Sequence, residues 1–490
     1  MSPEFLNNDT ICAPATPAGG GAVSIIRLSG PRCFEIVDSV VEFINSSAAQ
    51  SKGYRLKRGK LAALDDVLVA IFRAPKSYTG EDCAEIYCHA SPYIVRSALE
   101  LLCAKGCRMA EAGEFTRRSF LNGKMDLAQA EAVADLIAAS SEAQHRVASS
   151  QLRGGYSQEL RLIRSSLVEL SALLELELDF SEEEVEFANR ERLAALLEDA
   201  LKRCETLASS FRLGNAIKNG IPVAIAGAPN SGKSTLLNAL LGDERAIVSD
   251  IPGTTRDTVE DTKVIGGVLF RFIDTAGIRE SSDQIERMGI ERSVEALRKA
   301  YLSLCVVDLS SENAVQDCLE ILNLCRGCGQ KVILVLNKID LAGKTGEEGG
   351  LALVVGSETD DLVGNLLFNK NVSSINKIVS SSDYKGIVLD SVRISAKSGF
   401  GLDKLRELIV SACGTDIQGD ILVTSKRHAD ALRSSAAALR ACLDGLHSGI
   451  SPDLLAEDLR EALSSLGSIT GEITSDEVLG EIFRKFCIGK

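Results

Sequence analysis

The sequence predicts a multidomain protein of the α/β plus α class: an α/β domain inserted in an all-α helical domain, preceded by a small α+β N-terminal domain. Three observations predict this fold class. A Gly-rich loop at 227–234 lies between a strand-like and a helix-like run. Apolar residues recur at helical spacing on both sides of the segment that contains this loop. The first 120 residues instead alternate short strand-like and helix-like runs.

The N-terminal part, predicted as a domain at 1–122, combines strands with a helix. Strand-like apolar runs occupy Val23–Leu28, Leu61–Phe72 and Ala84–Cys88, and a helix-like run occupies Ser91–Ala104. Runs of this kind, separated by turn residues, are typical of a small α+β domain.

Two helical segments, at 123–219 and 412–490, flank the inserted domain. In the first, one apolar stripe is formed at spacings of three and four by Leu160, Ile163, Leu167, Leu170 and Leu174. Ser181–Glu184 is predicted to begin a helix, because Ser caps helix N-termini and Glu is favoured in the first turn. Helical periodicity returns from Thr424 onward. We expect the two halves to pack as one bundle; two separate helical modules are the alternative.

The inserted segment, 220–411, opens on the most informative motif of the chain, Gly227–Ser234. The strand-like run Ile221–Ala226 precedes it and the helix-like run Thr235–Leu241 follows, which is the context of a P-loop. Its backbone N–H groups can wrap a phosphate. Lys233 is predicted to reach the β- and γ-phosphates, and Ser234 to hold Mg²⁺ through its hydroxyl group.

The base is predicted to be guanine. Asn337–Asp340 ends a buried strand-like run, and the Asp340 carboxylate can accept hydrogen bonds from guanine N1 and its 2-amino group. Adenine offers neither donor there, and a site of this kind can reject such an analogue by roughly 10⁴-fold. Ser395–Lys397 follows a further strand-like run and is predicted to contact the base as well.

Two further segments complete the order of a Ras-like GTPase domain. Asp274–Gly277 closes a strand-like run; its Asp suits a water-mediated Mg²⁺ contact and its Gly N–H suits the γ-phosphate. Gly253–Asp257 has loop chemistry, and Thr255 or Thr254 can hold the metal when the loop closes. The predicted GTP-binding residues are Asn230, Ser231, Gly232, Lys233, Ser234, Thr235, Ser249, Asp250, Ile251, Pro252, Gly253, Thr254, Thr255, Asp274, Thr275, Ala276, Gly277, Asn337, Lys338, Asp340, Ser395, Ala396 and Lys397.

Two positions depart from the common GTPase pattern. Ile278 stands where many GTPases place a Gln that orients the attacking water, and an isoleucine cannot do so. Glu286 is a carboxylate within plausible reach; its alternative is a solvated helix charge. Asn230 can offer a side-chain oxygen to a monovalent cation beside the phosphates, with backbone carbonyls near Ser249 and Ile251. The alternative is that Asn230 only caps the loop.

Composition limits the other functions. A formal net charge of −14 argues against a broadly basic nucleic-acid-binding surface. Fourteen Cys without regular spacing and only four His do not favour structural zinc; they indicate reduced thiols and a cytoplasmic location. No membrane span and no signal peptide are expected. Residues 341–390 are rich in Gly, Ser, Asn and Asp and are predicted to form a long, partly mobile insert.

The chain resembles the MnmE (TrmE) family of tRNA-modifying GTPases. The matching segments are spread over the whole length: Asp9–Ile11 with Ala15–Pro17, Ser77–Asp82, Glu114–Arg118, Leu121–Ala132, the P-loop with Asn230, Gly253–Asp257, Asp274–Arg292 and the tail Cys487–Lys490. A GTPase domain alone has neither that tail nor that N-terminal domain.

The resemblance implies an activity. Such proteins are GTP hydrolases that act as homodimers and, with the FAD-dependent partner MnmG (GidA) in a heterotetramer or larger complex, add an aminomethyl-type group to C5 of the wobble uridine of certain tRNAs. Their N-terminal domain dimerises and binds 5-formyltetrahydrofolate or a related reduced folate. Potassium takes the place of an arginine finger.

The resemblance also assigns residues. Asn230, Ser249, Ile251 and Thr254 match potassium ligands, and Ser234 and Thr255 match magnesium ligands. Glu286 matches the water-orienting carboxylate, which with Lys233 makes the predicted catalytic pair. Arg27, Glu85, Lys124 and Lys490 match folate contacts, although the alignment at Glu85 could slip toward Glu81. Cys487 matches the family's tail cysteine; its alternative is part of a frayed C-terminus.

One departure and two rival functions accompany this interpretation. Family members often carry an Arg in the turn near Gly19–Gly21, where this chain has none. The main rival is a GTP-gated ribosome-assembly factor or RNA-binding switch, which the acidic charge and the tail disfavour. The second is a folate-binding one-carbon enzyme with a regulatory GTPase domain.

Overall fold

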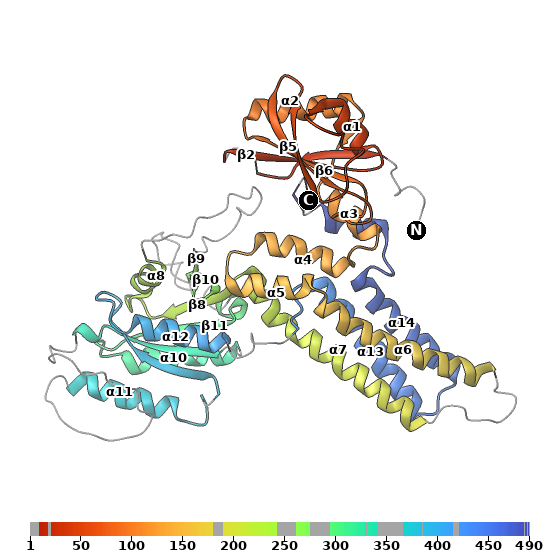
Figure 1. Cartoon of the computed structure of the whole chain (residues 1–490). Helices are drawn as coiled ribbons and strands as arrows, with labels where there is room; N and C mark the ends of the chain where they lie inside the picture. Colours follow the sequence, from red (N-terminus) through yellow and green to blue (C-terminus); the bar gives the residue numbers. More distant parts are fainter. Residues whose placement is uncertain are drawn as a thin grey trace. The chain divides into compact units, whose positions relative to one another are not determined.

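The computed structural model describes residues 9–17, 21–179, 190–242, 261–274, 295–328, 331–341, 366–384, 386–414, 421–484, 486–487 and 489. They divide into two compact units. Unit 1 draws on three stretches of the chain, Met1–Ala138, Ala148–Ala208 and Arg427–Lys490, and unit 2 on Ala139–Val147 and Ser209–Lys426. The predicted fold class is confirmed: an α/β domain interrupts an all-α domain that follows an N-terminal α+β domain (Figure 1).

The N-terminal part of unit 1 is a sheet with two helices, α1 and α2, packed on one face. Its strands lie in the order β3-β4-β5-β6-β2-β1-β7, and only β1 and β7 pair in parallel. Ile26 and Leu28 point into the core beneath α1 and α2, whereas Arg27 between them faces the other way. The elements are β1 (Thr10–Pro14), β2 (Val23–Ser29), α1 (Cys33–Val40), β3 (Val41–Phe43), β4 (Arg55–Leu61), β5 (Asp65–Phe72), β6 (Cys83–His89), α2 (Pro92–Ala104), β7 (Cys107–Met109) and α3 (Glu114–Leu121).

One strand prediction in this sheet is wrong. The apolar run Leu61–Phe72 was expected to form a single strand, but Leu61 ends β4 and Asp65 begins β5. The two residues pair antiparallel, and the N–H of Leu64 donates to the Leu61 carbonyl to close the turn. The turn itself is apolar, so hydropathy did not mark it.

The two helical segments pack together, as the one-bundle hypothesis predicted. The predicted stripe on α6, from Leu160 to Leu174, is buried, and α6 lies along α14 (Figure 1). Cys204 on α7 meets Ser435 on α13, with 3.9 Å between Sγ and Oγ. The helices are α4 (Leu127–Ala138), α5 (Glu142–Leu152), α6 (Gly155–Asp179), α7 (Arg190–Asn219), α13 (Lys426–His447), α14 (Pro452–Thr470) and α15 (Asp476–Phe483). Ser181–Glu184 lies outside the described residues.

A partly buried ionic cluster joins these halves. The Arg427 guanidinium lies 2.7 Å from the Glu131 carboxylate and donates to the Ser468 carbonyl at 2.6 Å, so α13 is tied to α4 and α14. His428 Nε2 is 3.2 Å from Glu131, and its ring stacks on Tyr156 of α6. Burial raises the pKa of Glu131, but the charges of His428 and Arg427 outweigh this effect and bring the pKa to about 2.

Unit 2 contains a six-stranded sheet in the order β13-β12-β11-β8-β10-β9, parallel except for the edge strand β9. Parallel neighbouring strands are joined by crossover connections, which place helices on both faces of the sheet. The elements are β8 (Ile221–Gly227), α8 (Lys233–Leu241), β9 (Asp261–Ile265), β10 (Val268–Asp274), β11 (Leu302–Asp308), α10 (Ala314–Gly327), β12 (Lys331–Asn337), η3 (Ile339–Leu341), α11 (Leu366–Val379), β13 (Val388–Arg393) and α12 (Leu402–Gly414).

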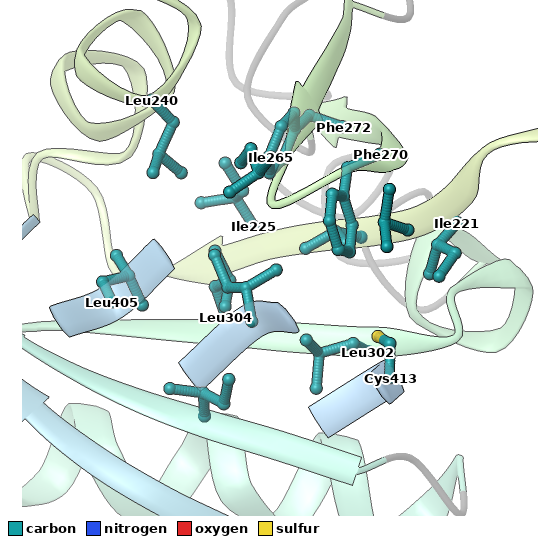
Figure 2. Close-up of a cluster of buried hydrophobic side chains, with 14 of the residues drawn as sticks. Ile221, Ile225, Leu240, Ile265, Phe270, Phe272, Leu302, Leu304, Leu405 and Cys413 are labelled. Carbon is teal, nitrogen blue, oxygen red and sulfur yellow. The ribbon is translucent and has the colours of Figure 1, made fainter. Parts of the chain in front are cut away.

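Both faces of this sheet are apolar, which explains its nearly continuous hydrophobic strands. Along β11, Leu302 and Leu304 point toward one core, whereas Cys305 and Val307 point toward the other. Figure 2 shows the first core, in which Ile225 and Phe270 meet residues of α8 and α12. The rigid sheet fixes the positions at which its strands end, and the predicted site residues lie there.

The segment predicted as an insert is in part a component of this core. Ile375 on α11 and Tyr384 after it are buried in the second apolar cluster, and the Tyr384 hydroxyl donates to Asn323 Oδ1 at 2.7 Å. The prediction of an insert over 341–390 is therefore wrong from Leu366 onward, because α11 supplies apolar side chains to the sheet. Residues 342–365 lie outside the described part of the chain.

The two ends of the inserted domain lie against each other. The N–H of Val423 donates to Ser210 Oγ at 3.0 Å, and a Cβ at Gly214 would collide with the Val423 carbonyl oxygen. An insertion whose ends meet can interrupt a helical domain without separating its two halves. Among the described residues, no helix is both long and apolar enough to cross a bilayer.

We expect Glu131→Gln to lower the free energy of unfolding by on the order of 2 kcal/mol at pH 7, because it leaves Arg427 without a charged partner. The Glu131 pKa is depressed, so its contribution is complete above about pH 4.5 and is lost as the pH falls toward about 2. Denaturation followed by circular dichroism should therefore give a difference from wild type that shrinks across this interval. Glu205→Gln, which breaks an exposed pair with Arg440, is the control and should cost less than about 0.5 kcal/mol. A pH-independent difference would contradict the assignment.

Candidate nucleotide-binding site

The Gly-rich loop follows the central strand β8 and leads into α8. Gly232 precedes the helix with φ 97°, and Asn230 also has a left-handed backbone at φ 63°. A Cβ at Gly227 would lie 2.5 Å from the Val306 carbonyl oxygen. Glycines that leave the backbone bare before a helix N-terminus make a cradle for a phosphate, since the first N–H groups of the helix have no partner within it.

Lys233, the first residue of α8, points back into this loop. Its Nζ donates to the carbonyl oxygens of Gly227 and Ala228, at 2.8 Å each. The ammonium group is thus held above the loop, where phosphate oxygens can compete for the same donor. Ser234 and Thr235 are exposed at the start of the helix, and the buried Ser231 hydroxyl has no hydrogen-bond partner within the described part of the chain.

Asn337 joins this loop to the other two predicted base-contacting loops. It is 2% exposed; its amide nitrogen donates to the Ser231 carbonyl at 2.9 Å, and its amide oxygen accepts from the N–H of Ala396 at 3.0 Å. One side chain therefore connects the ends of β8, β12 and β13. The phosphate loop and the base loops cannot shift independently while both bonds persist.

The residues predicted to contact the base lie at the same edge of the sheet. Lys338 has φ 64° and its Nζ lies 2.7 Å from Asp308 Oδ2, and Asp340 is exposed in η3. The N–H of Ser395 donates to the Phe400 carbonyl at 3.0 Å, which closes the loop that carries exposed Lys397. In open α/β sheets, ligands bind beyond the carboxyl ends of the strands, and these residues all lie there.

The structure brings together Asn230 to Thr235, Asn337, Lys338, Asp340 and Ser395 to Lys397. The backbone of Asp274 ends β10 and pairs with Ile225. Ser249 to Thr255, Thr275 to Gly277 and Glu286 lie outside the described residues.

A second group of predicted residues meets in unit 1. Arg27 on β2 is paired in register with Glu85 on β6, and its guanidinium lies 2.8 Å from Glu85 Oε1. The same guanidinium lies over the rings of Tyr78 and Phe115, 5.5 and 5.7 Å from their centroids, and donates to the Gly489 carbonyl at 3.4 Å. The C-terminal tail therefore passes beside Arg27.

The structure separates the two acidic candidates of the sequence. Glu81 accepts from the Ser29 hydroxyl at 2.6 Å and pairs with buried Arg118 at 3.2 Å, so it belongs to an internal ionic cluster with Asp9 and Glu114. Glu85 is the carboxylate that faces Arg27.

The remaining predicted residues lie on neighbouring loops. Lys124 donates from Nζ to the Pro75 carbonyl at 3.0 Å. Cys487 is exposed, and its carbonyl accepts from the N–H of Gly113 at 3.4 Å. Lys490 lies outside the described residues.

Sequence reasoning missed three groups near these sites. Tyr78 and Phe115 stand in segments that it singled out, but only the fold shows that both rings flank Arg27. Asp308 carried no sequence signal beyond its place at the end of an apolar run. Asp308 ends β11 opposite Asn337, the first residue of the NKxD motif, in the parallel pairing of β11 with β12. A carboxylate at the end of the strand-like run before that motif could therefore have indicated Asp308.

A parallel sheet with a P-loop tied through Asn337 to an NKxD loop defines the class of P-loop GTPases. Family profiles add the particular branch: that of the MnmE helical domain matches residues 127–487, and that of the GTP-binding protein TrmE N-terminus matches residues 10–124. The chain belongs to the MnmE (TrmE) family.

Individual relatives agree with the profiles. The tRNA modification GTPase MnmE of Bacteroides fragilis is 46% identical over 494 residues, which cover 99% of this chain and 100% of that protein. The protein of the same name from Porphyromonas gingivalis is 46% identical over 499 residues, which cover 99% of this chain and 98% of that protein. Among solved structures, the G domain of the T. maritima FeoB iron transporter is 26% identical with a TM-score of 0.25 and covers 39% of this chain and 98% of that one.

We expect Gly232→Ala to weaken nucleotide binding more than tenfold, because the new Cβ meets the Asn337 amide and the backbone is left-handed. Isothermal titration with GDP measures the effect. Gly242→Ala is the matched control: it has φ 62° and no atom of the described residues lies within 4 Å of the new Cβ, so it carries backbone strain without crowding from them. Equal losses in the two variants would show that strain alone, and not the contact with Asn337, is responsible.

Proposed function

We propose that the protein is a potassium-activated GTP hydrolase that, with an FAD-dependent partner of the MnmG (GidA) type, takes part in adding an aminomethyl-type group to C5 of the wobble uridine of certain tRNAs. The single observation that supports this most is the Asn337 side chain, which joins a phosphate-binding loop to a guanine-type base loop in a chain of this family. The curated relatives are named tRNA modification GTPases.

The residues present fit a magnesium-bound triphosphate. Ser234 offers an exposed hydroxyl at the start of α8, and the bare glycine backbone before it leaves room for phosphate oxygens. We propose Ser234 and Thr255 as magnesium ligands; the ion would neutralise charge on the β- and γ-phosphates. Lys233 supplies a fixed positive charge to the same oxygens, and Asp340 selects guanine through its two N–H donors.

The potassium proposal rests on Asn230. It is exposed at the turn of the loop, and its left-handed backbone sets the side chain apart from the helix that follows. An amide oxygen together with the carbonyls of Ser249 and Ile251 and with Thr254 is an all-oxygen set, which suits a hard monovalent cation. That cation would supply positive charge between the β- and γ-phosphates.

The proposal for the attacking water rests on sequence. Ile278 has no group that can orient water, and Glu286 is the carboxylate that the family pattern places for that task. We propose that the Glu286 carboxylate accepts a hydrogen bond from the water and directs its lone pair at the γ-phosphorus.

The folate proposal rests on the Arg27 site. A reduced folate carries carboxylates and a pterin ring with an amide edge. Arg27, Lys124 and Lys490 suit the anionic part, and Glu85 suits the donor edge of the pterin. The partly exposed ring of Tyr78 beside Arg27 offers apolar surface for a planar ligand, and the buried ring of Phe115 supports the Arg27 guanidinium from within the core.

The homodimer proposal rests on the open face of the N-terminal sheet. Leu56, Ala70, Glu85 and Arg27 form one row across β4, β5, β6 and β2, on the face opposite α1 and α2. Leu56 is 61% and Leu68 43% exposed on this face. A second copy that covers these side chains would also approach the Arg27 site, which lies on the same face.

The cytoplasm is the proposed location. All fourteen cysteines are free, as expected where thiols are kept reduced. The tRNA substrate and the flavin partner are proposed to meet the protein there.

We expect hydrolysis to be several-fold faster in K⁺ than in Na⁺ at equal ionic strength, because only K⁺ matches the proposed oxygen cage. Asn230→Ala should abolish the preference by removing one ligand. Steady-state phosphate release with each salt measures both effects. Equal rates in the two salts for the wild-type protein would remove potassium from the mechanism.

Cells that lack this protein should contain wobble uridine without the C5 group in the affected tRNAs, which mass analysis of tRNA nucleosides detects. Wild-type chain should restore the modified nucleoside. Lys233→Ala should fail because nucleotide binding is lost, and Glu286→Ala should fail although it still binds GTP. If cells that lack the protein contained as much C5-modified wobble uridine as wild-type cells, the proposed function would be refuted.

A further inference from the structure

Asp308 and Lys338 form an ion pair at the carboxyl edge of the unit 2 sheet. Asp308 is the last residue of β11 and lies opposite Asn337 in the parallel pairing with β12. Its Oδ2 is 2.7 Å from Lys338 Nζ, and the two side chains are only 16% and 29% exposed. A pair with so little solvent contact is screened less than a surface pair.

The Asp308 carboxylate is itself fixed. Its other oxygen accepts from the N–H of Ser310 at 3.0 Å and from the Ser310 hydroxyl at 2.6 Å. Burial raises the pKa of Asp308, but hydrogen bonds from Lys338 and Ser310 outweigh burial and hold the pKa below its usual range. Asp308 is therefore a charged, oriented anchor at neutral pH.

The loop after Asp308 is held from the opposite side by α11. Asn371 is 3% exposed, and its amide nitrogen donates to the carbonyls of Leu309 at 3.3 Å and Ser311 at 3.1 Å. A buried amide committed to two loop carbonyls restrains that loop strongly, since breaking the bonds would leave polar groups unpaired in the core. The helix within the supposed insert thus supports the loop that carries Asp308.

Lys338 is the residue of the base loop that most needs an anchor. Its φ of 64° is unfavourable for a side-chain-bearing residue, by about 1 kcal/mol. Asn337 before it is bonded to two loops, and the N–H of Ile339 after it donates to the Ile394 carbonyl at 3.3 Å. Asp340, the proposed reader of guanine, follows two residues later.

We propose that Asp308 is a positioning residue for guanine recognition: by holding the Lys338 ammonium, it keeps the base loop in the conformation that presents Asp340. This inference rests on the guanine site proposed above. Both oxygens of the Asp308 carboxylate are engaged by Lys338 and Ser310, so we expect Asp308 to act on nucleotide affinity through Lys338 and not on the hydrolysis step. A purely structural ion pair would instead change the stability of the domain and leave affinity unchanged.

The test is Asp308→Asn, which keeps the shape of the side chain and removes its charge. The dissociation constant for GDP should rise about tenfold, while kcat at saturating GTP stays near wild type. Asp317→Asn is the matched control: Asp317 lies near Asp308, and among the described residues it makes no ion pair, so GDP affinity should not change. Unchanged affinity in Asp308→Asn would overturn the inference.

A second variant shows whether Asp308 acts through Lys338. In the background of Lys338→Met, Asp308→Asn should weaken GDP binding no further, because the ion pair is already absent. If each substitution weakened GDP binding by its full factor in the double variant, so that the two factors multiplied, the inference would be overturned. Asp340→Asn tests the guanine site separately: it should shift preference toward xanthosine nucleotides. If Asp340→Asn shifts the preference while Asp308→Asn leaves GDP affinity unchanged, only the positioning role of Asp308 is refuted. If Asp340→Asn does not shift the preference, the proposed guanine site itself is refuted.

Discussion

The nucleotide site depends on one buried amide. Asn337 donates to the loop after β8 and accepts from the loop after β13, so its two bonds hold three strand ends in one arrangement. Because it is almost fully buried, neither bond can be exchanged for water without cost. The glycine at 232 is required by the same contact, since any side chain there would occupy the position of the Asn337 amide. Phosphate and base binding are thus mechanically linked before any ligand arrives.

Much of the fold could be predicted because its signals are local. The strand–loop–helix around Gly227–Ser234 and the stripe from Leu160 to Leu174 follow from hydrophobic periodicity and glycine placement. The errors arose where that signal is ambiguous. The turn at Ala62 is apolar and so was hidden within a strand-like run, and α11 was hidden in a segment whose composition is that of a loop.

The site could be predicted in its residues but not in its connections. The NKxD and P-loop motifs indicated side chains that the structure brings to one edge of the sheet, whereas the pairing of Asp308 with Lys338 and the rings flanking Arg27 depend on contacts between distant segments. Arg27 and Glu85 illustrate the difference. The sequence left Glu81 as an alternative to Glu85. The structure distinguishes their surroundings, because Glu85 is paired in register with Arg27, whereas Glu81 forms an ion pair with Arg118.

The pairing of α6 with α14 has a consequence during translation. Asp179 ends α6, but α14 begins only at Pro452, so the ribosome needs roughly 15–55 s at 5–20 residues per second to supply the second helix. The middle of the nascent chain can complete its own sheet in that time, because both of its apolar faces are covered by helices that it encodes itself. The leucine-rich side of α6 that meets α14 stays uncovered until the last helices emerge.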